Sequence, residues 1–209
     1  MSKIPVLEIF SDYIWPWCYF ITGRVERLRS EFETRIQWVA FPLHPDTQPQ
    51  GRTLEDLFAG RNIDIQQKLV QLKQVARDLE LPFGDRKMTF NSRLSQELGK
   101  WAEQMGRGQA FHDAVFRAYF ADGRNIAEIN ILVDIATSVG LDATEAHDVI
   151  EARTFKEPVD TDWTRAHELR VTAVPTFLMN GQALVGAQTY NALADFMRQN
   201  SVNHRPRSH

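Results

Sequence analysis

Residues 11–19 (SDYIWPWCY), near the N-terminus, hold the side chains best suited to chemistry. Cys18 is the single cysteine of the chain, and a cysteine thiolate is a strong nucleophile. Pro16 favours the first position of a helix, because the N–H group that proline lacks has no partner there. The pattern therefore predicts a helix that begins at Pro16, with Trp15 at its N-cap and Cys18 in its first turn.

Two opposing effects act on a thiol in this position. Free backbone N–H groups and the helix dipole favour an anion in the first turn, which would lower the thiol pKa. The tyrosines and tryptophans around Cys18 form an apolar environment, which would raise it. Cys18 is therefore either a reactive nucleophile or a small buried apolar residue, and both hypotheses stay open at this point.

Neither the cysteine content nor the histidine spacing predicts a metal site. One cysteine excludes a disulfide within this chain and a metal site built from several cysteines. No histidine pair has a metal-ligand spacing such as H-E-x-x-H, so no metal is predicted. We expect His112, His147 and His167 to face solvent on helices, and His44 to be a surface residue in a proline-flanked loop.

The elements on either side of this segment must hold it at the end of a strand. Residues 4–10 (IPVLEIF) and 35–41 (RIQWVAF) are short apolar runs typical of strands, with the Pro16 helix between them. A β-α-β unit of this kind has parallel strands and a right-handed crossover.

Strand signals return near the C-terminus. Residues 176–179 and 183–185 are apolar runs on either side of Asn180-Gly181, the strongest short hairpin signal. Thr189 is the expected N-cap of a last helix.

Between these two groups of strands the apolar residues recur at helical spacing. Capping patterns at Asp64, Asn125 and Asp142 mark helix starts. One apolar helix face is expected from Ile65, Leu69, Leu72, Ala76 and Leu79.

A β-α-β unit followed by a β-β-α unit is the element order of the thioredoxin fold. We predict an α/β chain with a thioredoxin-fold domain over residues 1–49 and 169–200. An all-helical insertion is expected over residues 50–168, and a polar, disordered tail over residues 201–209.

The motifs resemble one known family. Trp15-Pro16-Trp17-Cys18-Tyr19 after Asp12 is similar to the Cys-Pro-Trp-Cys-Tyr motif of the FrnE-like branch of the DsbA oxidoreductases, and Val174-Pro175-Thr176-Phe177 is similar to their proline loop. The resemblance implies a cis bond before Pro175, which would face the active-site helix. Residues 41–45, 89–94 and 116–120 also resemble that branch, so the resemblance spans residues 5–199.

One departure from the family motif decides the chemistry. Trp15 occupies the position of the family's exposed nucleophilic cysteine, and Cys18 matches the less accessible resolving cysteine. Without a second thiol the chain cannot hold the oxidised form of the motif, so dithiol–disulfide exchange is excluded. The leading hypothesis is therefore an oxidoreductase-family protein that acts on thiols through one cysteine.

Two alternatives use the same scaffold. One is a glutathione-dependent isomerase or transferase, although Trp15 lacks the hydroxyl that activates glutathione in the related enzymes. The other is a non-redox protein that binds a small molecule, with Trp15 as an aromatic surface for an apolar ligand.

The resemblance and the motif together assign the site residues. The predicted catalytic residues are Cys18, Trp15 and Pro175, and the predicted binding residues are Trp17, Tyr13, Leu43, Asn91 and Val174. For Asp12 we favour a turn role over that of a site carboxylate, and for Asn91 a capping or loop role is the alternative.

Composition limits the partners. The 209 residues have a net charge of −3, which argues against a broad basic surface for nucleic acid or an anionic membrane. The N-terminus lacks the long apolar stretch of a signal peptide, so a cytoplasmic protein is expected. We expect a small-molecule or thiol substrate, no tightly bound cofactor, glutathione as the candidate cosubstrate, and a monomer or homodimer.

Overall fold

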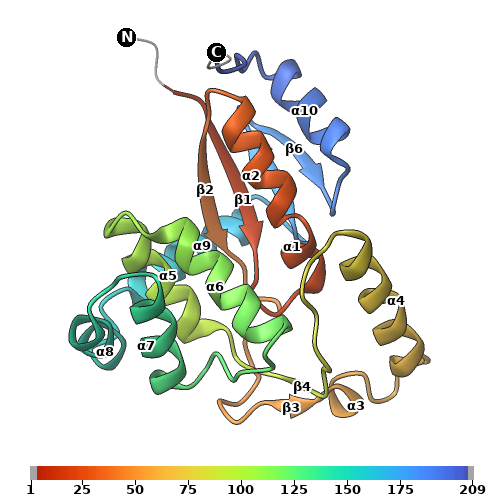
Figure 1. The fold of residues 1–209 in the computed structure, drawn as a ribbon, viewed down its shortest axis with the longest axis vertical. Coiled ribbons are helices and arrows are strands. Elements are labelled where there is room, and N and C mark those ends of the chain that lie inside the picture. The colour runs from red at the N-terminus through yellow and green to blue at the C-terminus, as the bar shows by residue number, and fades with distance from the viewer. Residues whose placement is uncertain (1–3, 207–209) are drawn as a thin grey trace.

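A four-stranded sheet forms the centre of the computed structural model, which describes residues 4–206 (Figure 1). Its strand order is β2-β1-β5-β6. The strands are β1 (Val6–Ser11), β2 (Arg35–Ala40), β5 (Thr176–Met179) and β6 (Gln182–Val185). β1 and β2 are parallel, whereas β5 is antiparallel to both of its neighbours. This is the sheet that the β-α-β and β-β-α patterns predict.

The turn between β5 and β6 confirms the hairpin prediction. Asn180 and Gly181 have φ angles of 51° and 77°, and both lie in the left-handed region. A two-residue hairpin turn with this conformation matches the twist of the flanking strands, and glycine and asparagine tolerate it best.

Three helices belong to the sheet domain: α1 (Pro16–Phe20), α2 (Thr22–Glu31) and α10 (Tyr190–Gln199). Side chains of α2 and α10 share one buried cluster with the strands, including Leu28, Met197, Ile9 and Phe177. The predicted cap of the last helix is confirmed, because Ala192 N–H donates to the Thr189 hydroxyl at 3.2 Å.

The segment between the strands contains seven helices among the described residues: α3 (Leu54–Leu57), α4 (Ile65–Asp78), α5 (Arg93–Gln104), α6 (Gly108–Phe120), α7 (Ile129–Ser138), α8 (Ala143–Glu151) and α9 (Lys156–Glu168). It is not all-helical, since β3 (Arg52–Thr53) and β4 (Met88–Thr89) form a small antiparallel sheet. These two-residue strands have no apolar run or hairpin turn to signal them, because 34 residues of chain separate Thr53 from Met88.

The helix caps were predicted with one error. As expected, Asp64 accepts a hydrogen bond from Gln67 N–H and Asp142 accepts one from Glu145 N–H, each at 2.9 Å. Asn125 instead accepts from Ala127 in a turn, and α7 begins only at Ile129, after Glu128.

The prediction of a disordered tail is wrong for residues 201–206. Val202 is buried, Glu33 N–H donates to the Asn203 carbonyl at 2.8 Å, and Phe32 forms a bridge with His204. The polar composition of the tail concealed one apolar anchor and a set of backbone hydrogen bonds to the end of α2. The prediction for residues 207–209 lies outside the described residues.

Within residues 4–206, no helix combines the length and the apolar character that a membrane crossing requires.

Candidate active site

The predicted active-site turn connects the end of β1 to the start of α1. Pro16 is the first residue of α1, and Trp15 is the N-cap with extended backbone (φ −98°, ψ 116°). Cys18 N–H donates to the Trp15 carbonyl at 3.0 Å, so Cys18 lies in the first turn as predicted. The local pattern of the sequence therefore determines this geometry.

Asp12 stabilises the turn through hydrogen bonds that its carboxylate accepts. It is buried, and its carboxylate accepts N–H groups from Ile14 at 3.3 Å and from Leu43 at 2.9 Å. Burial raises the pKa of Asp12 to about 6, against the opposing effect of hydrogen bonds from Ser92, Leu43, Ile14 and Gln96. Asp12 thus has the turn role favoured above, and it connects the turn to the loop that follows β2.

The register of β1 and β5 brings the proline loop to the same place. Phe10 pairs with Thr176, and the next step of the antiparallel register places Pro175 beside Ser11. The bond between Val174 and Pro175 is cis, and both residues are buried. Segments more than 150 residues apart in the sequence therefore meet at one end of the sheet.

Cys18 is fully buried, with 0% exposure. Burial raises the pKa of its thiol to about 12, and the hydrogen bonds with Ser11 and with the Asp12 backbone only partly oppose this effect. The helix contributes little anion stabilisation, because α1 has only five residues. The thiol is therefore protonated at neutral pH, which favours the hypothesis of a small buried residue.

This burial predicts slow alkylation of Cys18. At pH 8 we expect iodoacetamide to modify the native protein more than about a thousandfold more slowly than an unperturbed thiol, because a pKa near 12 leaves almost no thiolate. Intact-mass spectrometry against time, with the urea-unfolded protein as control, measures the rate. Native-state modification close to the unfolded rate would show that the thiol is accessible.

A cavity of about 480 Å³ opens beside the turn, between α1 and α4. Trp15 and Trp17 line it on the side of the turn, together with Leu43 from the loop after β2. The opposite walls come from α3, the residues after it and α4, with apolar side chains at Leu54, Leu57, Phe58, Ile65, Leu69 and Leu72. Its size is typical of sites for small organic ligands, which range from about 300 to 1,000 Å³.

α4 forms the wall of this cavity opposite the turn. Figure 1 shows it beside α1, apart from the helices α5–α9. Ala76 is the one residue of α4 that is buried. Of the predicted apolar face, Ile65, Leu69 and Leu72 line the cavity, whereas Ala76 belongs to the core and Leu72 and Leu79 pack against it. The sequence contained this stripe, but its spacing alone cannot distinguish core from ligand site.

Three of the five predicted binding residues, Tyr13, Asn91 and Val174, do not line this cavity. The Asn91 amide donates to the carbonyls of Pro45 and Thr47, at 3.1 and 2.7 Å, and its oxygen accepts from Arg93 N–H. Asn91 therefore has the loop role weighed above, and it does not line the cavity.

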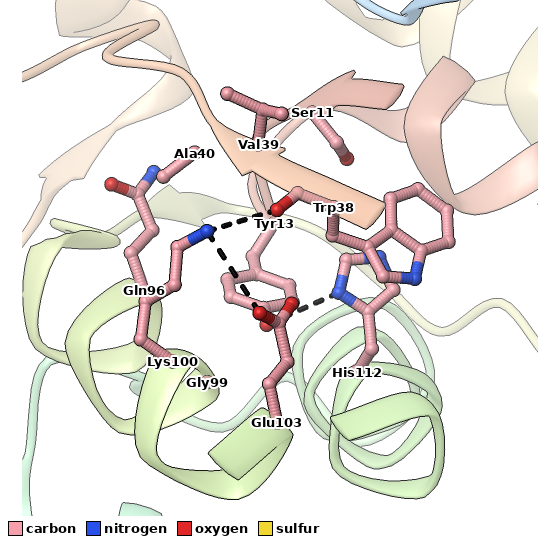
Figure 2. A pocket seen from close by; sticks show the side chains of 10 residues that line it. All are labelled: Ser11, Tyr13, Trp38, Val39, Ala40, Gln96, Gly99, Lys100, Glu103 and His112. Carbon is pink, nitrogen blue, oxygen red and sulfur yellow. Dashed lines mark hydrogen bonds and ion pairs between the residues drawn. The ribbon is translucent and has the colours of Figure 1, made fainter. Parts of the chain in front are cut away.

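Tyr13 does not line the cavity, and its side chain lies beside Glu103 and His112 of the helical insertion (Figure 2). Its hydroxyl and Nδ1 of His112 are hydrogen bonded at 3.1 Å, and the His112 ring stacks on Trp38 with centroids 3.8 Å apart. The space between these side chains is about 20 Å³, enough for a single water molecule but not for a ligand.

The expectation that His112 faces solvent is wrong, because its exposure is 5%. Burial, with a smaller contribution from the Lys100 ammonium, lowers the pKa of His112 to about 3. The imidazole is therefore neutral, and among the described residues its Nε2 has no hydrogen-bond partner. The residues on either side of His112 gave no indication that Trp38 and Tyr13 would cover it.

A mixed sheet of this order, with a helix starting beside a cis-proline loop, defines a thioredoxin-fold protein. The family model of the DSBA-like thioredoxin domain matches residues 6–198. The chain therefore belongs to this family.

Comparison with individual proteins agrees with this assignment. The uncharacterised protein YwbO of Bacillus subtilis (strain 168) is 26% identical over 182 residues, which cover 87% of this chain and 90% of YwbO. The crystal structure of a probable DsbA oxidoreductase from Streptomyces coelicolor is similar with a TM-score of 0.86 and 26% identity, covering 94% of this chain and 90% of that one.

A cytosolic disulfide reductase, DsbM of Pseudomonas aeruginosa, has the same fold. Its TM-score is 0.67 at 18% identity, over 93% of this chain and 98% of DsbM. DsbM has also been solved with GSH.

Proposed function

We propose that this chain is a member of the DsbA family that binds an apolar small molecule beside its active-site turn and does not exchange disulfides. One observation carries the proposal: Trp15, which the family motif aligns with the nucleophilic cysteine, forms a wall of the 480 Å³ cavity. The substitution that removes the redox chemistry thus adds aromatic surface to a ligand site.

The surroundings of Trp15 support binding. Most side chains that line the cavity are aliphatic or aromatic, so a ligand with an apolar body gains free energy by leaving water there. Trp17 and Ile63 are exposed large hydrophobic residues at this site, with 38% and 37% exposure. Exposed apolar surface beside a cavity is typical of a ligand-binding groove.

A matched pair of variants on α4 tests the proposal. Naphthaleneacetamide, a neutral apolar probe, is expected to bind the wild type in isothermal titration calorimetry. Leu69→Gln is expected to weaken this binding at least about tenfold, because a leucine side chain contributes about 1.5–3 kcal/mol of apolar burial.

Val70→Gln is the control on the same helix, because Val70 is 64% exposed and does not line the cavity. It should leave the affinity unchanged. Equal effects of the two substitutions, or no binding by the wild type, would contradict the proposal.

Thiol chemistry through Cys18 alone is a weaker candidate function. It is supported by family membership and by the position of Cys18 in the first turn of α1. The burial of Cys18 and its raised pKa oppose this function. The alkylation rate of Cys18 described above tests whether the thiol is reactive.

Glutathione remains the candidate cosubstrate for the thiol-based alternatives. The support is the solved complex of DsbM with GSH, and the proximity of the Val174–Pro175 loop to the turn. A peptide-like thiol could add to the exposed edge before Pro175 as an extended strand. Glutathione should then raise the melting temperature of both the wild type and Leu69→Gln.

We also propose that the protein acts in the cytoplasm, as DsbM is described to do, because no part of this proposal requires an oxidising compartment.

A further inference from the structure

The charged residues at the 480 Å³ cavity have one sign. Lys68 of α4 and Arg86 of the loop before β4 line it, together with the imidazole of His44. None of the described residues that line the cavity is an aspartate or a glutamate. This contrasts with the chain as a whole, which has more acidic than basic residues.

Arg86 is held in place without a carboxylate partner. Its Nη2 donates to the Tyr119 hydroxyl at 3.0 Å, and its guanidinium carbon lies 4.9 Å from the centroid of the Phe120 ring. The described residues provide no ion pair for Arg86, and its Nε is buried without a hydrogen-bond acceptor. A buried guanidinium N–H without an acceptor is costly, so an acceptor supplied by a ligand would be strongly favoured.

Two more arginines add positive charge near His44, which lines the cavity. Arg52 and Arg61 lie close enough to His44 to disfavour its protonation, after the larger effect of burial, and both lower the pKa of the imidazole. Arg52 likewise has a buried Nε without an acceptor within residues 4–206. An anion in the cavity therefore meets two cations of the lining, with two more near His44, and no competing carboxylate from the lining.

We infer that the cavity binds an apolar monocarboxylate, whose hydrocarbon body packs on Trp15 and Leu69 and whose carboxylate accepts hydrogen bonds from Arg86. The inference rests on the proposed function, and it adds the chemical class of the ligand. A guanidinium suits this role because its parallel N–H groups match the two oxygens of a carboxylate. Lys68, at the exposed edge of the site, adds a second positive charge.

A pair of probes with the same ring system tests the inference at pH 7. Naphthaleneacetate carries the carboxylate, whereas naphthaleneacetamide is its neutral counterpart of nearly equal shape. We expect calorimetry to show that the wild type binds the acid about tenfold more tightly than the amide, as hydrogen bonds to charged groups commonly provide. Arg86→Gln should remove this preference, so that the acid and the amide bind this variant with affinities within about twofold of each other.

Three further variants make the result specific. Lys68→Gln should reduce the preference for the acid in part, and it leaves the contact between Arg86 and Tyr119 in place if Arg86→Gln does not fold. Arg86→Lys keeps the charge and should retain part of the preference. Arg77 is an exposed arginine of α4, the helix of Lys68, and it does not line this cavity. Arg77→Gln should therefore leave the affinities for both probes unchanged.

The outcomes separate this inference from the proposed function. Equal affinities of the wild type for acid and amide, or an unchanged preference in both Arg86→Gln and Lys68→Gln, would overturn the inference while the apolar site remains. Binding of neither probe would overturn the proposed function and the inference with it.

Discussion

The variant Trp15→Cys is expected to form an internal disulfide with Cys18 and to gain the dithiol–disulfide exchange that the wild type lacks. Residues 15 and 18 both belong to the first turn of α1, where Cys18 N–H donates to the carbonyl of residue 15. Side chains three residues apart on a helix lie about 5–6 Å apart at Cβ, and a small movement at the helix start brings them to the geometry of a disulfide. The rest of the family's active-site turn and proline loop is in place.

Thiol counting and an activity assay measure this gain. After mild oxidation, treatment with an alkylating agent followed by mass spectrometry should find no free thiol in the variant. Reduction with dithiothreitol should restore both thiols, at positions 15 and 18. Insulin reduction should rise from the level of the reaction without protein to a measurable rate.

The double variant Trp15→Cys/Cys18→Ala is the control, since it has a thiol at the nucleophile position and no resolving partner. It should form only mixed disulfides with added glutathione. Failure of Trp15→Cys to close the disulfide would mean that the turn of this chain differs from that of the active members of the family.

Acidification from pH 7 to pH 4 is expected to lower the free energy of unfolding by about 3 kcal/mol through His112 alone. Burial, assisted by the Lys100 ammonium, lowers the pKa of this imidazole from 6.5 to about 3 in the folded protein. The unfolded chain therefore binds more protons than the folded one between these two pH values. The contribution of His112 is complete above pH 6.5 and is lost as the pH falls through that window.

Asp12 has the opposite effect in an overlapping window. Its pKa is raised from 3.8 to about 6, so the folded protein binds more protons there and its stability falls as the pH rises from 3.8 to 6. The pH dependence of the wild type is a sum of both contributions. Only the difference between the wild type and a His112 variant isolates the histidine.

Urea unfolding of the wild type and of His112→Gln at pH 7 and pH 4 provides this difference. Glutamine keeps an amide oxygen that can accept from the Tyr13 hydroxyl, and it has no group that titrates. His147→Gln is the control, since the side chain of His147 is 51% exposed. An equal loss of stability in the wild type and His112→Gln would mean that the ring of His112 is accessible to protons in the folded state.

The sequence by itself determined the order of the strands and the local geometry of the active-site turn. The apolar runs, Pro16 and Asn180-Gly181 act on their immediate neighbours through backbone geometry, so their effects can be recognised in a short segment. The resemblance to the family motif likewise predicts from one position that Trp15 replaces the nucleophilic cysteine. The absence of a dithiol mechanism follows from the single cysteine of the chain, since it depends on which atoms are present and not on their surroundings.

Only the tertiary structure decided the state of Cys18 and the existence of the cavity. The same helix start is compatible with a reactive and with an inert thiol, and the burial of Cys18, which raises its pKa to about 12, favours the inert one. The stripe at Leu69 and Leu72 forms a cavity wall because the fold leaves a gap between it and Trp15. The helical spacing of the stripe does not specify what the stripe will face. Burial and cavities depend on contacts between residues far apart in the chain, and for this reason local patterns do not reveal them.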